Sequence, residues 1–293
     1  MTRLILMLIG IVGFVGQAPA GTLDSIAVTK IIHIGFIDGQ APFAVKNTNG
    51  AAAGYAIDLC DDIAGSLRQS IPGLQVIKVE TNLTDAFHDI IIGKIDLLCG
   101  AVTATLSRRE LVDFSQPIFI TGMSALLRQD SPADIRDLVT DDRQISPPRS
   151  LMMRAFANHI FGVRAGSTTA ATLRRVVKQD LDGASIIEYD THEAGLAALR
   201  QRQIDAYFAD RGLLIGLLQD KADTGGLIIA DRWFTHEPYA IALPRGDSAF
   251  RLAVDRALTE FYESPDFMPL LRRYFADNAT TVAEAVLMQS LPK

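Results

Sequence analysis

The sequence has no run rich in lysine and arginine, and its 28 basic residues are outnumbered by 34 acidic ones, for a formal net charge of −6. Because proteins that bind nucleic acid carry basic patches, this composition argues against a nucleic-acid partner. Cysteine and histidine are also scarce, with two and five residues, and their spacing matches no metal-ligand motif. We therefore expect neither a metal ion nor a cofactor.

The hydrophobic run at the N-terminus, Leu4 to Gly16, is too short to span a bilayer comfortably. It follows Arg3 and precedes Ala18-Pro19-Ala20, and these three segments match the parts of a secretory signal peptide. We expect residues 1–20 to be removed by cleavage near Ala20. No cysteine lies near the cleavage point, which argues against a lipid anchor. The mature chain is then expected to be a soluble exported protein.

Strands and helices alternate in the first hundred residues. The hydrophobic patterns predict strands over 31–37, 74–80 and 95–98 and helices over 55–69 and 82–92. This alternation calls for a parallel sheet with right-handed crossovers. Ligands bind at the carboxyl ends of such strands, so we expect a site directly after residue 98.

Small and hydroxyl residues follow the third of these strands, as in many ligand sites. Ser107-x-x-Glu110 has the spacing of a capping box and predicts a short helix with Arg108 at its first position. The guanidinium beside the hydroxyls of Thr103 and Thr105 is suited to gripping a carboxylate. The alternative is an arginine that is merely solvated on a loop.

A second series of strands and helices begins at residue 160. The Gly-Ser-Thr turn at 166–168 opens a helix, so it is either an anion site at the helix N-terminus or simply a good N-cap. Asp190 or Thr191 caps the next helix and places His192 in its first turn. His192 then either contacts a ligand or is simply a solvated residue. Asp210 ends the strand over 204–210, and its default interpretation is a cap for the following helix.

The two cysteines are able to meet. Cys60 lies on the apolar face of the predicted helix over 55–69, and Cys99 ends the strand that this helix would cover. A disulfide persists in an oxidising compartment, where it would contribute roughly 4 kcal/mol by restricting the unfolded chain. Two buried free thiols are the alternative.

Several short segments resemble those of the amino-acid-binding proteins of bacterial uptake transporters, the family 3 periplasmic solute-binding proteins. They are Gly-Lys-Ile-Asp-Leu and Arg-x-x-x-Val-Asp-Phe-Ser on either side of the first turn, and Gly-Ser-Thr-Thr and Asp-Ala-Tyr-Phe-Ala-Asp in the second half. The resemblance extends from about residue 31 to residue 275 and is greatest to the glutamate/aspartate-binding branch. It implies an α/β, two-lobed type II periplasmic-binding-protein fold. Each lobe would be a mostly parallel sheet flanked by helices, and two crossing strands would join the lobes.

The resemblance also implies a division of the chain and a function. Lobe 1 would comprise residues 21–124 and 240–293, and lobe 2 residues 125–239 with an insertion at 141–160. Residues 277–293 are predicted to be a tail. The protein would act in the periplasm as a monomer, capture a small amino acid or close analogue between its lobes, and deliver it to the permease of an ABC transporter in the inner membrane.

The resemblance assigns polar residues of both lobes to the α-amino and carboxylate groups of the ligand: Ala101, by its backbone carbonyl, Thr103, Arg108, Ser167, Thr168 and Asp210. Arg108 and Thr103 would hold the carboxylate from lobe 1, and the Gly-Ser-Thr turn would hold it from lobe 2. Asp210 would bind the α-ammonium. Arg108 and Asp210 would thus face the two ends of one zwitterion.

Four further positions would choose the ligand's side chain: Ile37, Phe43, Ala86 and His192. The glutamate/aspartate-binding branch has arginines where we align Ile37 and Ala86, and a histidine where His192 stands. Without these cations an acidic side chain would be buried with little compensation, which argues against glutamate and aspartate as ligands. Phe43 is placed in the site by the resemblance, although a phenylalanine there also suits the core.

Two other functions use the same scaffold. Some dehydratases that act on cyclic amino acids resemble this family, and an exported enzyme of that type would need an acid or base in the cleft. Asp85, Glu188, His192 and Glu193 are candidates, but no spacing singles one out. A ligand-sensing domain would use the same binding chemistry. We expect binding without catalysis.

Overall fold

The computed structural model of the protein describes residues 21–133, 135–136, 159–180, 184–219 and 226–293. The expected signal peptide lies outside the described residues, and so does the expected insertion except for its last two residues. Within those ranges, no helix combines the length and the apolar character that a membrane span needs.

The sheet of lobe 1 has the strand order β4-β1-β5-β12-β6. Its strands are β1 (Ile31–Ile37), β4 (Gln75–Thr81), β5 (Leu97–Leu98), β6 (Asp113–Thr121) and β12 (Glu237–Leu243). β1 pairs in parallel with β4 and β5, whereas β12 runs antiparallel to β5 and β6. The sheet is therefore mixed rather than mostly parallel, because the strand that returns from lobe 2 enters it in the opposite direction.

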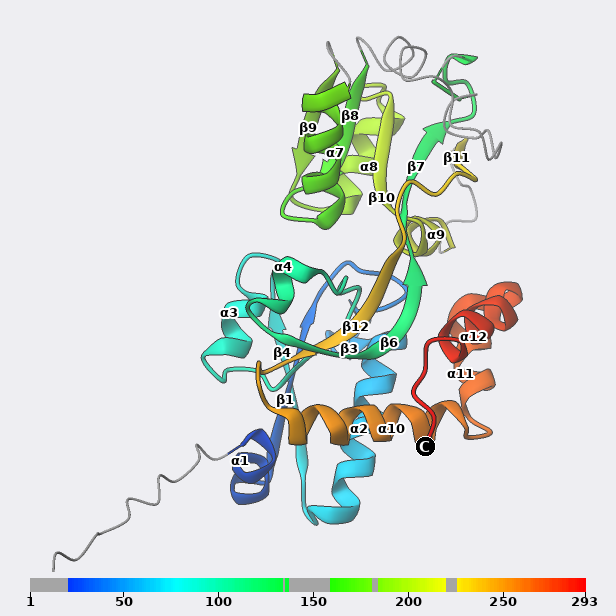
Figure 1. Ribbon diagram of the computed structural model, residues 1–293. Coiled ribbons are helices and arrows are strands. Elements are labelled where there is room, and N and C mark those ends of the chain that lie inside the picture. The colour runs from blue at the N-terminus through cyan, green and yellow to red at the C-terminus, as the bar shows by residue number, and fades with distance from the viewer. Residues whose placement is uncertain (1–20, 134, 137–158, 181–183, 220–225) are drawn as a thin grey trace, which may run out of the picture.

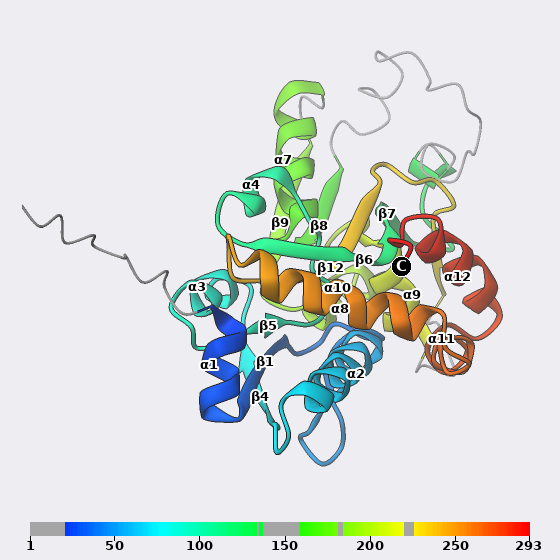
Figure 2. The ribbon, with the colours of Figure 1, turned by 60° about the horizontal axis from the view of Figure 1, so that its bottom comes forward.

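Helices cover the sheet of lobe 1: α1 (Thr22–Thr29), α2 (Tyr55–Ser70), α3 (Ala86–Ile91), α10 (Ser248–Tyr262) and α11 (Phe267–Phe275). Figure 2 shows α10 running along the sheet beside β6, with α2 next to it. In α2, Leu59, Ile63 and Leu67 recur every four residues and are buried, as an amphipathic helix requires. A small hairpin, β2 (Val45–Lys46) and β3 (Ala52–Ala53), precedes α2.

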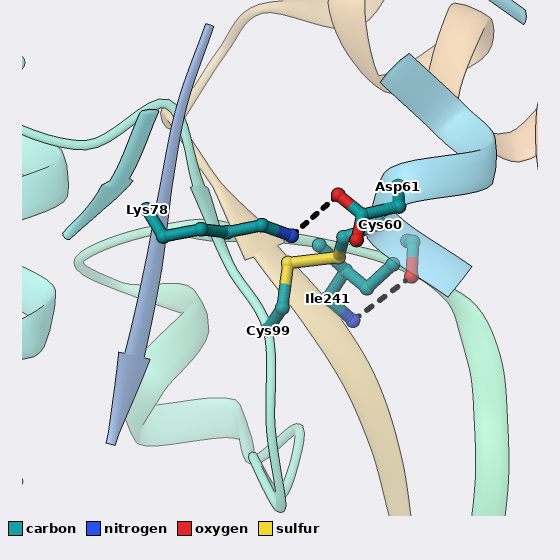
Figure 3. The surroundings of a disulfide bond; sticks show 6 residues. Cys60, Asp61, Lys78, Cys99 and Ile241 are labelled. Carbon is teal, nitrogen blue, oxygen red and sulfur yellow. Dashed lines mark hydrogen bonds and ion pairs between the residues drawn. A yellow bond between two sulfur atoms is a disulfide. The ribbon is translucent and has the colours of Figure 1, made fainter. Parts of the chain in front are cut away.

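A disulfide joins α2 to the chain that follows β5. Cys60 and Cys99 are bonded, with their Cα atoms 6.5 Å apart, which confirms the expected pairing. Figure 3 shows the bond between the helix and the sheet, close to the ion pair of Lys78 with Asp61. The bond lies next to Gly100 and Ala101, so it fixes the turn on which the first half of the expected site depends.

The sheet of lobe 2 has the strand order β11-β7-β10-β8-β9. Its strands are β7 (Met123–Arg128), β8 (Ile160–Arg164), β9 (Ser185–Tyr189), β10 (Ala206–Asp210) and β11 (Leu227–Ile229). β8 pairs in parallel with β9 and β10, and β7 pairs antiparallel with β10 and β11. The helices of this lobe are α7 (Thr168–Asp180), α8 (His192–Arg200) and α9 (Arg211–Gln219).

Two crossing segments connect the lobes. Figure 1 shows the two sheets at opposite ends of the molecule, with β6 continuing into β7 and β12 returning beside them. The first crossing passes through Gly122, where an added Cβ would lie 1.8 Å from the carbonyl oxygen of Thr235 in the returning segment. Only glycine allows the two crossing segments to approach so closely.

The C-terminal segment is helical, so the prediction of a tail was wrong. A 3-10 helix (Ala276–Asn278) is followed by α12 (Ala279–Leu287), which packs beside α11. Ala279, Ala283 and Val286 are buried against the core of lobe 1. These positions have the four- and three-residue spacing of a helix face, but alanine gives a weak hydrophobic signal.

Candidate functional site

A cavity lies between the lobes where the carboxyl ends of β5 and β10 face each other. Its lining includes most of the polar residues expected from the sequence: Gln40, Leu83, Ala101, Thr103, Arg108, Arg164, Ser167, Thr168, Thr169, His192, Phe208, Ala209, Asp210 and Leu213. The side chains leave only about 30 Å³ between them, room for one or two water molecules. An amino acid therefore needs the lobes or the lining side chains to move apart before it enters.

Arg108 is held in the cavity wall by a hydrogen bond and a cation–π contact. It lies on the short helix α4 (Leu106–Arg109), and its Nη1 donates to the carbonyl oxygen of Thr103 at 2.8 Å. The guanidinium also lies over the ring of Phe87, 5.1 Å from the centroid. Burial lowers the pKa of Arg108, and the charges of Asp210 and Glu237 oppose that shift. An arginine remains a cation under these conditions.

The N-cap of α4 differs from the prediction. Thr105 is the capping residue, since its hydroxyl accepts a hydrogen bond from the backbone N–H of Arg108 at 3.2 Å. Ser107, the expected cap, lies inside the helix. The helix therefore starts two residues earlier than the capping box suggested, and Arg108 is its third residue rather than its first.

Hydroxyl groups from the two lobes meet across the cavity. The hydroxyl oxygens of Thr103 and Thr168 are 3.5 Å apart, and the Thr168 hydroxyl donates to Oε2 of Glu237 at 3.0 Å. Ser167 instead uses its hydroxyl within lobe 2, where it donates to the carbonyl oxygen of Arg164 and accepts from the backbone N–H of Ala170. Its hydroxyl therefore caps α7, and Thr168 is the hydroxyl that reaches lobe 1.

Asp210 is a buried carboxylate on the opposite side of the cavity from Arg108. Its Oδ1 accepts from the Thr169 hydroxyl at 3.2 Å, and its Oδ2 accepts from the Tyr239 hydroxyl at 2.5 Å. Burial and the nearby Glu237 raise the pKa of Asp210 to about 6, against the opposing effect of these hydrogen bonds and of Arg108. At neutral pH the group is thus mostly ionised and ready to attract a cation.

His192 stands at the start of α8, where Thr191 is the N-cap, one of the two predicted capping residues. The imidazole is buried, and its Nδ1 lies 2.9 Å from the hydroxyl oxygen of Tyr207. Burial and the charge of Arg164 lower the pKa of His192 to about 3. The histidine is therefore a neutral polar group in the cavity wall.

Three of the expected site residues do not line the polar cavity. Phe43 is a core residue, with its ring centroid 4.8 Å from that of Phe119 and 5.1 Å from that of Tyr239, so its placement in the site is corrected. Ile37 and Ala86 are buried in an apolar cluster and line a second small cavity, which Arg108 also lines.

Arg164 and Gln40 line the cavity but were not expected there. The Oε1 atom of Gln40 accepts from the backbone N–H of Ala101 at 3.0 Å and so supports the first turn. Arg164 ends β8, two residues before the first residue of the Gly-Ser-Thr turn. A basic residue at the carboxyl end of a buried strand could have predicted that Arg164 lines the site. The same kind of signal, polar residues after a strand, pointed to residues 99–105.

The acid–base candidates for catalysis are dispersed. Asp85 is exposed near Asn82, and Glu188 pairs with Arg174 at 2.6 Å. Glu193 lines a neighbouring cavity, and only His192 belongs to the cavity that contains Arg108 and Asp210. Across the described part of the chain, no group of three or more histidine, cysteine, aspartate or glutamate residues is arranged to hold a metal ion.

Comparisons with known proteins agree with this architecture. The family model of the bacterial extracellular solute-binding proteins, family 3, matches residues 32–277. The L-glutamate/L-aspartate-binding protein of Pseudomonas aeruginosa is 26% identical over 265 residues, which are 89% of this chain and 82% of that protein. The L-cystine-binding protein TcyJ of Escherichia coli is 21% identical over 263 residues, covering 90% of this chain and 89% of that protein.

Solved structures share the fold. The ancestral amino acid-binding protein AncCDT-1, a precursor of cyclohexadienyl dehydratase, has a TM-score of 0.71 and 22% identity, and the match covers 87% of this chain and 100% of that one. A substrate-binding protein of an ABC uptake transporter from Streptococcus pneumoniae, with bound histidine, has a TM-score of 0.71 and 19% identity, covering 87% and 96%. These structures confirm the two-lobed α/β fold.

Proposed function

Because this chain belongs to the bacterial extracellular solute-binding proteins of family 3, we propose that it binds a small amino acid between its lobes and delivers it to an ABC transporter. One observation carries the proposal: a guanidinium from lobe 1 and a carboxylate from lobe 2, Arg108 and Asp210, line the same cavity. A zwitterionic α-amino acid presents the complementary pair of charges.

The ligand's carboxylate meets Arg108 and the Thr103 hydroxyl on lobe 1, and the start of α7 at Thr168 on lobe 2. The α-ammonium meets Asp210 and the carbonyl oxygen of Ala101. Micromolar affinity needs a binding free energy of about 8 kcal/mol. Charge-assisted hydrogen bonds in a site that excludes water are strong enough to supply it.

The relatives support the same class of ligand. By their names they bind glutamate and aspartate, or cystine, and one solved structure holds histidine. The transporter partner, the monomeric state, the periplasmic location, the signal peptide at 1–20 and the lobe boundaries remain part of the proposal.

Catalysis has less support than binding. The relatives named above are binding proteins, and the one acid–base candidate in the cavity, His192, has its pKa lowered to about 3. A neutral imidazole of such low basicity is a poor general base at neutral pH. Incubation with a bound amino acid is expected to return it unchanged, as measured by chromatography, whereas its consumption would support the dehydratase alternative.

The test of the proposed function compares two neighbouring arginines. Arg108 lines the cavity, whereas Arg109 on the same helix is exposed and does not. The protein is unfolded and refolded to remove any copurified ligand, and calorimetry then measures binding across the amino acids. Arg108→Ala should weaken binding at least a hundredfold, because the ligand's carboxylate would be buried without its cation. Arg109→Ala should bind as the unmodified protein does. Unchanged affinity in Arg108→Ala would contradict the assignment.

A further inference from the structure

Helix α9 belongs to lobe 2 by its place in the chain, but it packs into both lobes. Leu214 and Leu217 are buried in a core cluster of lobe 2, whereas Leu213 is buried in the large core cluster of lobe 1, with Phe43 and Phe119. Figure 1 shows α9 beside the crossing segments, between the two sheets. The helix is therefore a surface through which the lobes touch outside the ligand cavity.

Two glycines on one face of α9 allow a very close approach to lobe 1. An added Cβ at Gly216 would lie 2.2 Å from the carbonyl oxygen of Ala41 and 2.6 Å from Cδ of Pro42. At Gly212, four residues earlier and thus on the same face, an added Cβ would lie 2.9 Å from the ring of Phe119. Glycine is unfavourable within a helix, so these two positions are explained by the contact that they permit.

The lobe 1 side of this contact is a loop that hydrogen bonds hold in place. The backbone groups of Gln40 and Ala44 exchange two hydrogen bonds of 2.9 and 3.1 Å. The backbone N–H of Tyr55, the first residue of α2, donates to the carbonyl oxygen of Pro42 at 2.9 Å. The carbonyl group of Ala41 therefore cannot move aside by itself to make room for a larger residue on α9.

Both sides of the contact continue into the ligand cavity. Asp210 immediately precedes α9 and lines the cavity from lobe 2. On lobe 1, the loop that α9 touches contains Gln40, whose Oε1 accepts from the backbone N–H of Ala101. The distance between α9 and this loop therefore determines how far apart the two halves of the cavity lie. Gly216 itself lines the neighbouring cavity of about 570 Å³.

We propose that the face of α9 formed by Gly212 and Gly216 is the surface on which lobe 2 closes against lobe 1, and that Gly216 is a positioning residue for ligand capture. This inference rests on the proposed function. The contact uses no atom of the ligand, so it stabilises the closed arrangement equally for every amino acid that binds. A methyl group at Gly216 raises the free energy of the closed arrangement, whereas the open one, with α9 withdrawn from the loop, accommodates it.

The consequence for ligand affinity is measured by calorimetry on the refolded protein. Gly216→Ala should weaken the binding of every amino acid that the unmodified protein binds, by about tenfold or more and by the same factor for each. The order of preference among the amino acids should not change. A substitution that altered the ligand's own contacts would change that order.

The rates separate closure from a general loss of structure. A ligand enters the open arrangement and leaves only after the lobes separate, so Gly216→Ala should dissociate about tenfold faster or more without associating more slowly. Stopped-flow fluorescence of Trp233, the single tryptophan of the chain, measures both rates. Trp233 lies in the second crossing segment, against Gly122 of the first, so closure changes its surroundings.

Two further glycine variants complete the series. Gly212→Ala should lose less affinity, about three- to tenfold, because its close neighbours are phenylalanine ring atoms, which can shift more easily than the backbone at Ala41. Gly65→Ala is the matched control, since an added Cβ at this glycine of α2 meets nothing within 4 Å. It should bind as the unmodified protein does. Melting curves establish that each variant folds.

Three outcomes would overturn the inference. Gly216→Ala with the affinity and the dissociation rate of the unmodified protein would show that the contact does not control closure. If Gly216→Ala does not fold, unchanged affinity in Gly212→Ala has the same meaning. A loss of affinity for some amino acids and not for others would mean that Gly216 acts on the ligand through the neighbouring cavity. In these cases the proposed function stands, whereas it fails together with the inference if the unmodified protein binds no amino acid.

Discussion

At Asp210, burial and a neighbouring charge change the pKa of a carboxylate that is expected to bind the ligand. In the protein without ligand its pKa is raised to about 6, chiefly by burial and then by Glu237. A bound ammonium favours the carboxylate, so binding lowers this pKa and releases a proton near pH 6. Affinity should therefore rise about tenfold from pH 5 to pH 7 and then level off.

Calorimetry in buffers of different ionisation enthalpy measures both the affinity and the released proton. Asp210→Asn should bind more weakly and lose the pH dependence between pH 5 and pH 7, and a variant that kept that dependence would assign it to another group. The contribution of Asp210 to the stability of the protein without ligand changes with pH in the opposite direction. A raised pKa means that the native state holds the proton more tightly than the unfolded chain, so this group's contribution to stability falls as pH rises from about 4 to about 6.

The places of three site residues in the cavity wall were predictable, because strand ends marked them. Thr103, Arg108 and Asp210 follow or end short buried strands, and they line one cavity. Their binding roles come from the resemblance and stay a prediction. Phe43 was not predictable in this way, because its burial depends on Phe119 and Tyr239, which are distant in sequence. The hydrogen bonds that raise or lower a pKa likewise join distant segments.

At the scale of elements, the crossing at Gly122 is the tightest contact between segments. An added Cβ would meet the carbonyl oxygen of Thr235 at 1.8 Å and its carbonyl carbon at 2.8 Å, and both atoms belong to the backbone. Gly122→Ala should therefore lower the free energy of unfolding by about 1–3 kcal/mol, since one crossing segment must shift. Urea unfolding measures the change.

Gly65 provides the control for this substitution. It lies within α2, where an added Cβ meets nothing within 4 Å. Gly65→Ala should raise the free energy of unfolding by up to about 1 kcal/mol, because alanine favours a helix over glycine. A Gly122→Ala protein as stable as the unmodified one would show that the two crossing segments do not constrain each other.

Elements with strong periodic patterns were predicted nearly to their ends. β1 occupies the residues expected for it, and α2 ends one residue later than expected. The mixed character of the two sheets was not predictable, because the pairing of β12 with β5 and β6 joins segments more than a hundred residues apart. The helix α12 was missed because its buried positions are mostly alanine.

At the scale of the whole molecule, the lobes touch through the site itself. The Thr103 and Thr168 hydroxyls lie 3.5 Å apart, and Tyr239, on the second crossing strand, donates to Asp210 of lobe 2. The family resemblance predicted two lobes and two crossings. The distance between the lobes is not a property of any local pattern, because it depends on contacts that form only when both lobes are folded.

Closure should depend on a ligand that contacts both lobes. An amino acid held by Arg108 on lobe 1 and by Asp210 on lobe 2 binds the closed arrangement more tightly than the open one, so it shifts the population toward closure. Small-angle X-ray scattering should show a smaller radius of gyration when the unmodified protein is saturated with its ligand. Arg108→Ala at the same ligand concentration should keep the larger value, whereas Arg109→Ala should compact normally. If Arg108→Ala compacts as much as the unmodified protein, then closure does not require Arg108 to bind the ligand's carboxylate. The different positions of Arg108 and Arg109 on α4 would then have no effect on closure.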